Sequence, residues 1–155
     1  MKKEDFMKLA IKLAVENVSN GGGPFGAVIV RDNKVIATGV NRVTANNDPT
    51  AHAEISAIRA ACSELQTFDL SGCDIYTSCE PCPMCLGAIY WAHIDHIYYG
   101  CNKHDAAAAG FDDSFIYDEL ELPKEQRSKV IEELLPEEAM RTFDAWRANE
   151  QRIEY

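Results

Sequence analysis

Two short motifs constrain the fold more than any other part of this sequence, because their side chains suit a single metal ion. Cys82 and Cys85 stand three residues apart. At the start of a helix both thiolates can therefore face one metal, and the helix dipole favours their ionised form. His52 and Glu54 stand upstream, at the expected start of another helix. The chain is thus expected to bring the starts of two helices together around a metal.

Zinc is the metal that two cysteines and one histidine predict. A zinc ion with three protein ligands keeps a fourth position for water and lowers the pKa of that water toward about 7. We expect one zinc ion per chain, bound by His52, Cys82 and Cys85, with Glu54 moving protons instead of binding the metal. Alone, the histidine and the glutamate would each be structural at roughly three to one, so their combination with the cysteine pair carries the prediction.

The remaining cysteines allow a second interpretation. Cys79, Cys82 and Cys85 recur at every third position, a spacing that iron–sulfur proteins also use. No fourth cysteine follows at the ferredoxin spacing, and Cys79 precedes the helix, so we interpret it as a loop thiol. The other three are expected to pack as small core hydrophobes: Cys62, Cys73 and Cys101.

Length and composition are those of one globular domain. The 155 residues are 46% apolar and 26% charged, so we expect residues 1–155 to form a single domain. With no long apolar run and no secretory leader, the domain is expected to be soluble and cytoplasmic, where six cysteines stay reduced. A net charge of −10 argues against tight, sequence-independent nucleic-acid binding and favours a small-molecule substrate, and no membrane partner is expected.

The first hundred residues alternate between helical and strand patterns. A first helix, ending near Asn20, is predicted by apolar spacings of three and four, and its buried face is expected to comprise Phe6, Leu9, Ala10, Leu13, Ala14 and Asn17. Further elements are predicted over residues 26–30 and 34–40 (a hairpin), 49–62 (a helix opening at Pro49), 74–77 (a strand), 82–92 (a helix) and 96–99 (a strand). This alternation predicts a mixed α/β sheet with helices on both faces.

The pattern weakens beyond Gly100. Residues 105–117 are predicted to form a functional loop with a short helical turn, and residues 129–134 are predicted to form a further strand. Residues 136–155 are expected to form a C-terminal helix and tail. The apolar face of that helix is expected to comprise Ala139, Met140, Phe143 and Trp146.

The two motifs together resemble the His-x-Glu and Pro-Cys-x-x-Cys signature of the cytidine and deoxycytidylate deaminase family. The resemblance runs from the first helix to about Gly110 and includes residues 24–27 and 47–54. It implies a three-layer α/β/α fold with a mixed central sheet of about five strands. It also implies that zinc supports the hydrolytic removal of an amino group from a heterocycle.

Within that family the sequence is most similar to the short bacterial guanine deaminases. Residues 77–85, 89–92 and 110–117 carry this similarity. Transfer-RNA adenosine deaminases share the zinc motif but are typically more basic and lack the last of these segments. The resemblance therefore implies conversion of guanine to xanthine and ammonia in purine catabolism or salvage. Deamination of adenosine in transfer RNA, or of cytosine or another aminated heterocycle, is the alternative.

The resemblance also implies which residues hold the base. Purine pockets combine apolar walls with a few polar groups, and Phe25 and Trp91 would supply the walls. Asn41 and Asp113 would bind the edges of the base, with Asp113 helping Glu54 to protonate the departing amine. The other implied contacts are the backbone amide of Ala53 and the side chain of Tyr155. Without the resemblance, these residues would be interpreted as core aromatics, turn residues and a frayed end.

Two further implications concern assembly and the metal. The resemblance implies a homodimer whose C-terminal tails cover active sites, with the tails exchanged between subunits. The alternative from another class is a noncatalytic zinc-binding domain, which would close the fourth metal position with another cysteine or histidine. His93, His96 and His104 are available for this, but no ligand spacing links them to Cys82.

Overall fold

The computed structural model describes all residues, 1–155, and divides them into two compact units, residues 1–117 and 118–155. The first unit contains every strand of the chain. The second contains the short helix η1 (Lys124–Gln126) and the helix α7 (Pro136–Ala148). None of the helices combines the length and the apolar character that crossing a lipid bilayer requires.

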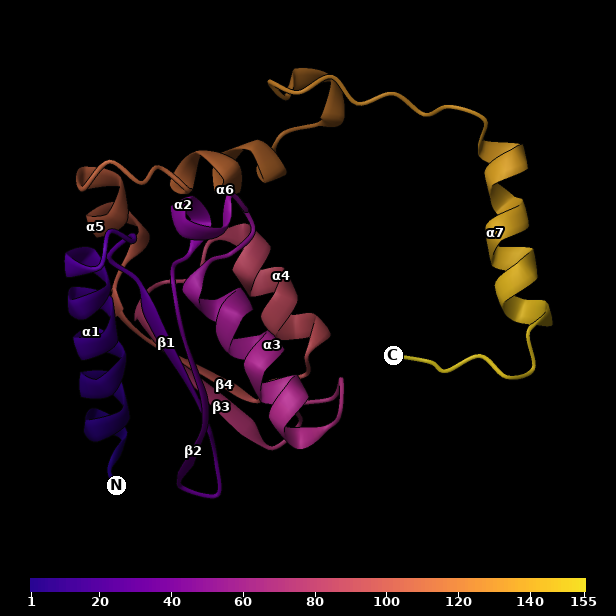
Figure 1. The fold of residues 1–155 in the computed structure, drawn as a ribbon. Coiled ribbons are helices and arrows are strands. Elements are labelled where there is room, and N and C mark those ends of the chain that lie inside the picture. The colour runs from indigo at the N-terminus through magenta and orange to yellow at the C-terminus, as the bar shows by residue number, and fades with distance from the viewer. The chain divides into compact units, whose positions relative to one another are not determined.

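Four strands form one mixed sheet in the order β2-β1-β3-β4 (Figure 1). The strands β1 (Gly26–Arg31) and β2 (Lys34–Val40) form the predicted antiparallel hairpin. Asp32 and Asn33 make its turn with φ values of 50° and 62°, the left-handed conformation that tight hairpin turns require. On its other side β1 pairs antiparallel with β3 (Cys73–Cys79), which pairs in parallel with β4 (His96–Cys101).

Helices cover both faces of this sheet, so the predicted three-layer α/β/α fold is confirmed (Figure 1). Helix α1 (Lys3–Ser19) packs on one face, and α3 (Ala53–Leu65) and α4 (Pro83–Trp91) lie on the other. The core beneath α1 is made by Phe6, Ala10, Val28, Val30 and Tyr76. The core beneath α3 and α4 includes Ile29, Ala57, Leu70, Ile75 and Ile89.

Two strand glycines allow the helices to lie directly on the sheet. A Cβ atom at Gly39 of β2 would overlap the carbonyl oxygen of Ala53 in α3. A Cβ atom at Gly26 of β1 would overlap the carbonyl oxygen of Ala10 in α1. The distance of α3 from the sheet is therefore set at its first turn, next to the metal motif.

The structure corrects two predictions in the second half of the chain. Residues 129–134 form no strand, and the sheet has four strands instead of about five. Val130 and Leu134 are 87% and 83% exposed, and their unit contains no other strand with which they could pair. Residues 105–117, predicted as a loop with one helical turn, contribute to two helices, α5 (Lys103–Ala108) and α6 (Ser114–Glu121).

Candidate metal centre and active site

The metal motif lies where two helices begin. His52 directly precedes α3 and Cys82 directly precedes α4. Both have extended backbones, with φ and ψ of −68° and 161° at His52 and −66° and 168° at Cys82. Cys85 follows in the first turn of α4. The amino-terminal ends of two helix dipoles therefore face the same cluster, which favours ionised thiolates there.

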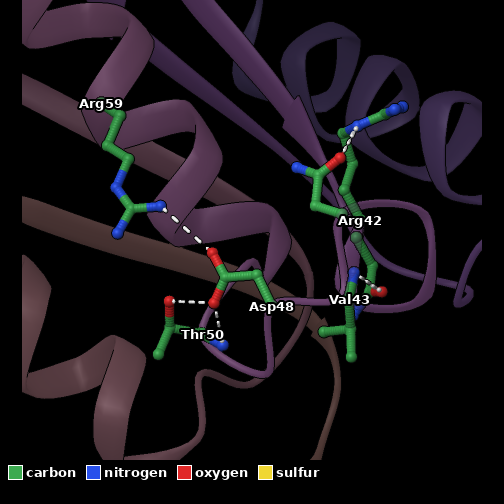
Figure 2. A network of polar contacts seen from close by, with 7 residues as sticks. Arg42, Val43, Asp48, Thr50 and Arg59 are labelled. Carbon is green, nitrogen blue, oxygen red and sulfur yellow. Dashed lines mark hydrogen bonds and ion pairs between the residues drawn. The ribbon is translucent and has the colours of Figure 1, made fainter.

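The prediction that the helix begins at Pro49 is wrong, because Asp48 holds the preceding residues in a turn. The Asp48 carboxylate accepts hydrogen bonds from the Thr50 amide at 2.9 Å and from the Thr50 hydroxyl at 2.6 Å (Figure 2). It also lies 3.8 Å from the guanidinium of Arg59 on α3 (Figure 2). The helix consequently starts at Ala53, and His52 lies at the junction between the turn and the helix. A short helix, α2 (Val43–Asn46), precedes this turn.

The three predicted ligands fit a tetrahedral zinc site. The Nδ1 atom of His52 lies 3.5 Å from Sγ of Cys82 and 3.4 Å from Sγ of Cys85. A nitrogen and a sulfur bound to the same zinc ion at a tetrahedral angle lie roughly 3.5 Å apart. All three donor atoms lie within 4.8 Å of one another. Of the other histidines, His96 is the first residue of β4 and pairs with Asp74 at 3.0 Å.

The three side chains perturb one another's protonation. The hydrogen bond from the Cys85 thiol, followed by that from His52, lowers the pKa of Cys82 to about 4. The same shared proton raises the pKa of Cys85. The hydrogen bond with Cys82 also raises the pKa of His52. A cation is the partner that this cluster suits, because it would replace the shared protons and satisfy both thiolates.

Glu54 meets the requirements for a proton carrier beside the metal. It lies in the first turn of α3, is only 7% exposed and lines the same cavity as His52. Burial raises the pKa of Glu54, so its carboxyl group exchanges a proton more readily near neutral pH than an exposed glutamate does.

Two of the metal ligands, His52 and Cys82, line a cavity of about 460 Å³. Phe25, Asn41 and Asp113, which are predicted to contact the base, line this cavity together with Glu54. The glycine segment of residues 21–23 forms another part of its wall. Residues separated by most of the first unit's length therefore converge on one site, with a size suited to a small ligand.

Phe111 is a wall of this cavity that the sequence did not predict as a contact. Its ring packs edge-on against Phe25, with centroids 4.9 Å apart and an interplanar angle of 83°. Both rings line the cavity. The available signal was its position in residues 110–117, the segment that carries the subfamily resemblance. The predicted second wall, Trp91, ends α4, is 67% exposed and does not line the cavity of its own chain.

Asp113 offers an acceptor that the protein itself does not use. Its Oδ1 atom is buried and accepts no hydrogen bond. Burial raises the pKa of Asp113, and the negative charges of Cys82 and Glu80 raise it further. Tyr117 holds this segment against the metal loop, because its hydroxyl donates a 2.6 Å hydrogen bond to the carbonyl oxygen of Pro81. Burial raises the pKa of Tyr117 to about 12, so the phenol remains a donor.

The cysteines outside the ligand set differ partly from prediction. Cys79 is the last residue of β3, not a loop residue, and its thiol lines the cavity 3.8 Å from the carbonyl oxygen of Asn102. Burial raises the pKa of Cys79 to about 12, and it lies outside the ligand cluster. Cys73 is buried as predicted and Cys62 is partly buried, but Cys101 is exposed at the edge strand β4.

The two remaining predicted contacts are the backbone amide of Ala53 and the side chain of Tyr155 in the C-terminal tail. Ala53, the first residue of α3, is fully buried, and its amide stands between His52 and Glu54. Tyr155 belongs to the second unit and is 76% exposed.

Comparison with known proteins gives consistent matches. Residues 1–101 match the cytidine and deoxycytidylate deaminase zinc-binding region. The guanine deaminase of Bacillus subtilis (strain 168) is 53% identical over 156 residues, which cover 100% of both chains. The X-ray structure of the Bacillus subtilis guanine deaminase superposes with a TM-score of 0.97, covering 100% of this chain and 99% of that one.

More distant relatives have two different activities. The tRNA-specific adenosine deaminase of Aquifex aeolicus (strain VF5) is 35% identical over 144 residues, covering 86% of this chain and 93% of that protein. The structure of a guanine deaminase from Nitrosomonas europaea is 35% identical, with a TM-score of 0.69, and the match covers 72% of this chain and 65% of that one.

Proposed function

The chain belongs to the cytidine and deoxycytidylate deaminase family, and from that premise we propose that it hydrolyses guanine to xanthine and ammonia. It is a zinc-dependent hydrolase with one metal site, formed by His52, Cys82 and Cys85. Full-length similarity to a guanine deaminase supports this substrate over transfer RNA, since the tRNA-specific relatives match less closely.

The observation that carries the choice of guanine is the buried, unpaired carboxylate oxygen of Asp113. A carboxylate in this position needs N–H donors, and a buried acceptor left without one is costly. Guanine presents both a ring N–H and an amino group along one edge. Adenine presents its single amino group beside a bare ring nitrogen, whose lone pair would face the carboxylate unfavourably.

The reaction follows from the placement of two carboxyl groups. When bound, zinc supplies a water of lowered pKa and a positive charge near the developing oxyanion. Glu54 accepts a proton from the attacking water and delivers it to ring nitrogen N3, so that C2 becomes electrophilic. Glu54 then accepts the second proton, from the hydroxyl group now bonded to C2, and with the assistance of Asp113 delivers it to the amino group. The C2–N bond breaks, ammonia leaves, and C2 keeps the carbonyl oxygen of xanthine. Each proton that Glu54 accepts is passed on, so the carboxylate is regenerated in every turnover.

The other walls hold the base in place. Phe25 and Phe111 would contact its faces, because their edge-on pair closes one side of the cavity with apolar surface. The side-chain amide of Asn41 and the backbone amide of Ala53 would bind polar atoms on its edges. The lining of the cavity supports the contacts of Phe25, Phe111 and Asn41, and family resemblance alone supports that of Ala53.

We also propose that the enzyme is a homodimer in which the C-terminal segments are exchanged, so that Tyr155 covers the active site of the other subunit. The support from the chain itself is that α7 has no buried residue. Its Met140, Phe143 and Trp146 are 46%, 56% and 39% exposed. In a dimer, the apolar face of α7 in each chain would pack against the other chain. Residues 1–155 of each chain would then form part of one folded domain, as the sequence predicts.

The proposed setting is purine catabolism or salvage in the cytoplasm. All six cysteines are free thiols, which suits a reducing compartment.

Product analysis tests the substrate. The purified zinc-loaded protein is incubated separately with guanine, adenine, cytosine, their nucleosides and a transfer-RNA anticodon stem-loop. We expect xanthine from guanine at a rate far above every other conversion, and a large loss of that rate in Asp113→Ala. Inosine in the RNA with guanine unchanged would assign the chain to the tRNA-specific activity instead.

A further inference from the structure

Asn17 is a polar residue on the apolar face of α1. That face packs against the sheet through Phe6, Ala10 and Ala14, and Asn17 continues it with only 7% of its surface exposed. A buried amide in such a position is stable only when its hydrogen bonds are made. The partners that it selects therefore show what the residue does.

Both hydrogen bonds of the Asn17 amide reach loops that line the active-site cavity. Its Nδ2 atom donates to the carbonyl oxygen of Gly23 and to the carbonyl oxygen of Asn41, each at 2.8 Å. The main-chain oxygen of Asn17 in turn accepts a 2.9 Å hydrogen bond from the amide of Gly22. One side chain of α1 thus connects the loop that contains Gly23 with the loop that contains Asn41.

The glycine loop is shaped around this side chain. A Cβ atom at Gly22 would overlap the amide group of Asn17. A Cβ atom at Gly23 would lie 3.0 Å from Cγ of Asn41. The chain therefore passes tightly between the two asparagines, and Asn17 contacts the segment of residues 21–23 that forms part of the cavity wall.

Asn41 is held at three points, and Asn17 supplies one of them. The amide of Asn41 donates to the carbonyl oxygen of Phe25 at 3.2 Å, and its carbonyl oxygen accepts from Asn17. Its side-chain Oδ1 accepts from the amide of Val43 at 3.2 Å. These three bonds fix the side-chain amide that lines the cavity, with its NH₂ group as the donor available to a ligand.

We propose that Asn17 is a positioning residue for the base: without touching the substrate, it fixes Asn41 and the glycine wall in the geometry that binds a purine. The inference rests on the proposed function for the identity of the base. Because the metal ligands and Glu54 lie at the starts of α3 and α4, on the opposite face of the sheet from α1, Asn17 governs substrate affinity and leaves the chemical step intact.

The test compares Asn17→Ala and Asn17→Asp with the wild-type enzyme. Alanine leaves two carbonyl oxygens without a donor, and the isosteric aspartate places an oxygen against them. We expect KM for guanine to rise by about tenfold or more, kcat to change by less than about twofold, and one zinc ion per chain to be retained. Unchanged KM in both variants overturns the proposal.

A double-mutant cycle separates positioning from loss of stability. If Asn17 acts through Asn41, most of the KM increase caused by Asn17→Ala disappears in an Asn41→Ala background. The same increase in both backgrounds overturns the proposal. Phe6→Leu, on the same buried face of α1, is the matched control: it should lower the Tm and leave KM unchanged.

Two further measurements keep the outcome clear. Gly22→Ala perturbs the same contact from the loop and should raise KM in the same way if the Asn17 variants do not fold. Turnover of guanine by the wild-type enzyme tests the proposed function by itself. If the wild type deaminates another heterocycle instead, the same variant-to-wild-type ratios are measured on that substrate, so the two proposals fail independently.

Discussion

At the scale of single residues, the site depends on carboxyl groups that are kept from water for different purposes. Glu54 is buried beside the metal ligands, whereas Asp113 reaches the cavity from the start of α6 with one oxygen unpaired. Burial raises the pKa of both carboxyl groups. Glu54 can therefore carry protons in the reaction, and Asp113 can select a ligand that brings its own N–H donors.

Glu54→Gln should separate catalysis from metal binding. The amide keeps the size of the side chain but cannot accept the proton of the attacking water. We expect kcat to fall by about 10² to 10⁴-fold while zinc content, measured by elemental mass spectrometry, stays at one per chain. His52→Ala, which removes a ligand, is the contrasting control and should lose zinc. Near-normal turnover in Glu54→Gln would show that another group moves the protons.

Thr50→Val should reveal how strongly the turn before α3 depends on charge. The hydrogen bond from the Thr50 hydroxyl, followed by that from its amide, lowers the pKa of Asp48 below its ordinary value of 3.8. A lowered folded-state pKa stabilises the fold above the unfolded-state pKa, and this contribution is lost as the pH falls through the folded-state pKa. The variant should therefore be less stable at neutral pH, with the difference vanishing in acid.

An NMR titration of the carboxylate carbon measures this directly. In Thr50→Val we expect the pKa of Asp48 to move up toward 3.8. Thr142→Val is the matched control, because the Thr142 hydroxyl donates to the carbonyl oxygen of Ala139 and to no carboxylate. An unmoved Asp48 pKa in Thr50→Val would contradict the hydrogen-bonded turn.

The sequence predicted residues of unusual chemistry and missed those defined by packing. His52, Glu54, Cys82 and Cys85 are recognisable because few side chains bind zinc or move protons, and their spacing is local. Phe111 is an ordinary aromatic residue until α5 and α6 bring it against the ring of Phe25. Cys101 shows the same limit, because its exposure is set by neighbours distant in sequence. The helical spacing predicted the burial of Asn17, but not its hydrogen bonds to Gly23 and Asn41.

At the scale of elements, the metal centre requires two helices to begin at one point. Helix α3 owes its position to the close contact of its first turn with Gly39 of β2. The spacing of motifs predicted this convergence, but the boundary at Pro49 was wrong because the competing turn at Asp48 uses a side chain that also suits a helix start. The missing strand at residues 129–134 has the same origin: local strand propensity without a neighbouring strand to pair with.

Gly39→Ala and Gly26→Ala should separate the two helix layers. Each Cβ atom would overlap a helix carbonyl oxygen, of Ala53 and Ala10 respectively, so each variant should lose about 1–3 kcal/mol of unfolding free energy. Only Gly39→Ala moves the helix that begins beside His52. We therefore expect its zinc affinity, measured by chelator competition, to fall clearly more than that of Gly26→Ala.

The control for this pair is Gly87→Ala in α4, where a Cβ atom meets no other atom within 4 Å. It should keep both stability and zinc affinity, since alanine is a good helix former. Equal zinc affinity in the Gly39 and Gly26 variants would show that the metal site does not depend on the contact between α3 and β2.

At the scale of the whole molecule, the second unit is the part that cannot be explained by one chain alone. It has no strand, and the apolar side chains of α7 are exposed. A helix of this length with an apolar face is marginal unless that face is packed. Our proposed dimer gives it a partner surface and gives the active site a cover, which a zinc deaminase needs to keep bulk water from the reacting base.

Deleting residues 153–155 tests the cover while sparing the helix before it. Arg152 is retained, because its guanidinium donates to the carbonyl oxygens of Arg147 and Asn149 at 3.1 and 3.3 Å and so closes the end of α7. We expect kcat/KM for guanine to fall by about tenfold or more, with zinc content and Tm nearly unchanged. Tyr155→Phe and Tyr155→Ala then show whether the hydroxyl or the ring is responsible.

Mixing chains decides which active site a tail serves. The truncated chain has an intact Glu54 but no Tyr155, and a full-length Glu54→Gln chain has a tail but cannot turn over. If tails are exchanged, a mixed dimer places the intact tail over the intact catalytic residues. Turnover per intact Glu54 should therefore rise above that of the truncated enzyme once the two preparations are unfolded and refolded together. Size-exclusion chromatography with differently tagged chains establishes that mixed dimers form. No such rise in those mixed dimers would mean that each tail covers the site of its own chain, and an unimpaired truncated enzyme would mean that Tyr155 covers neither.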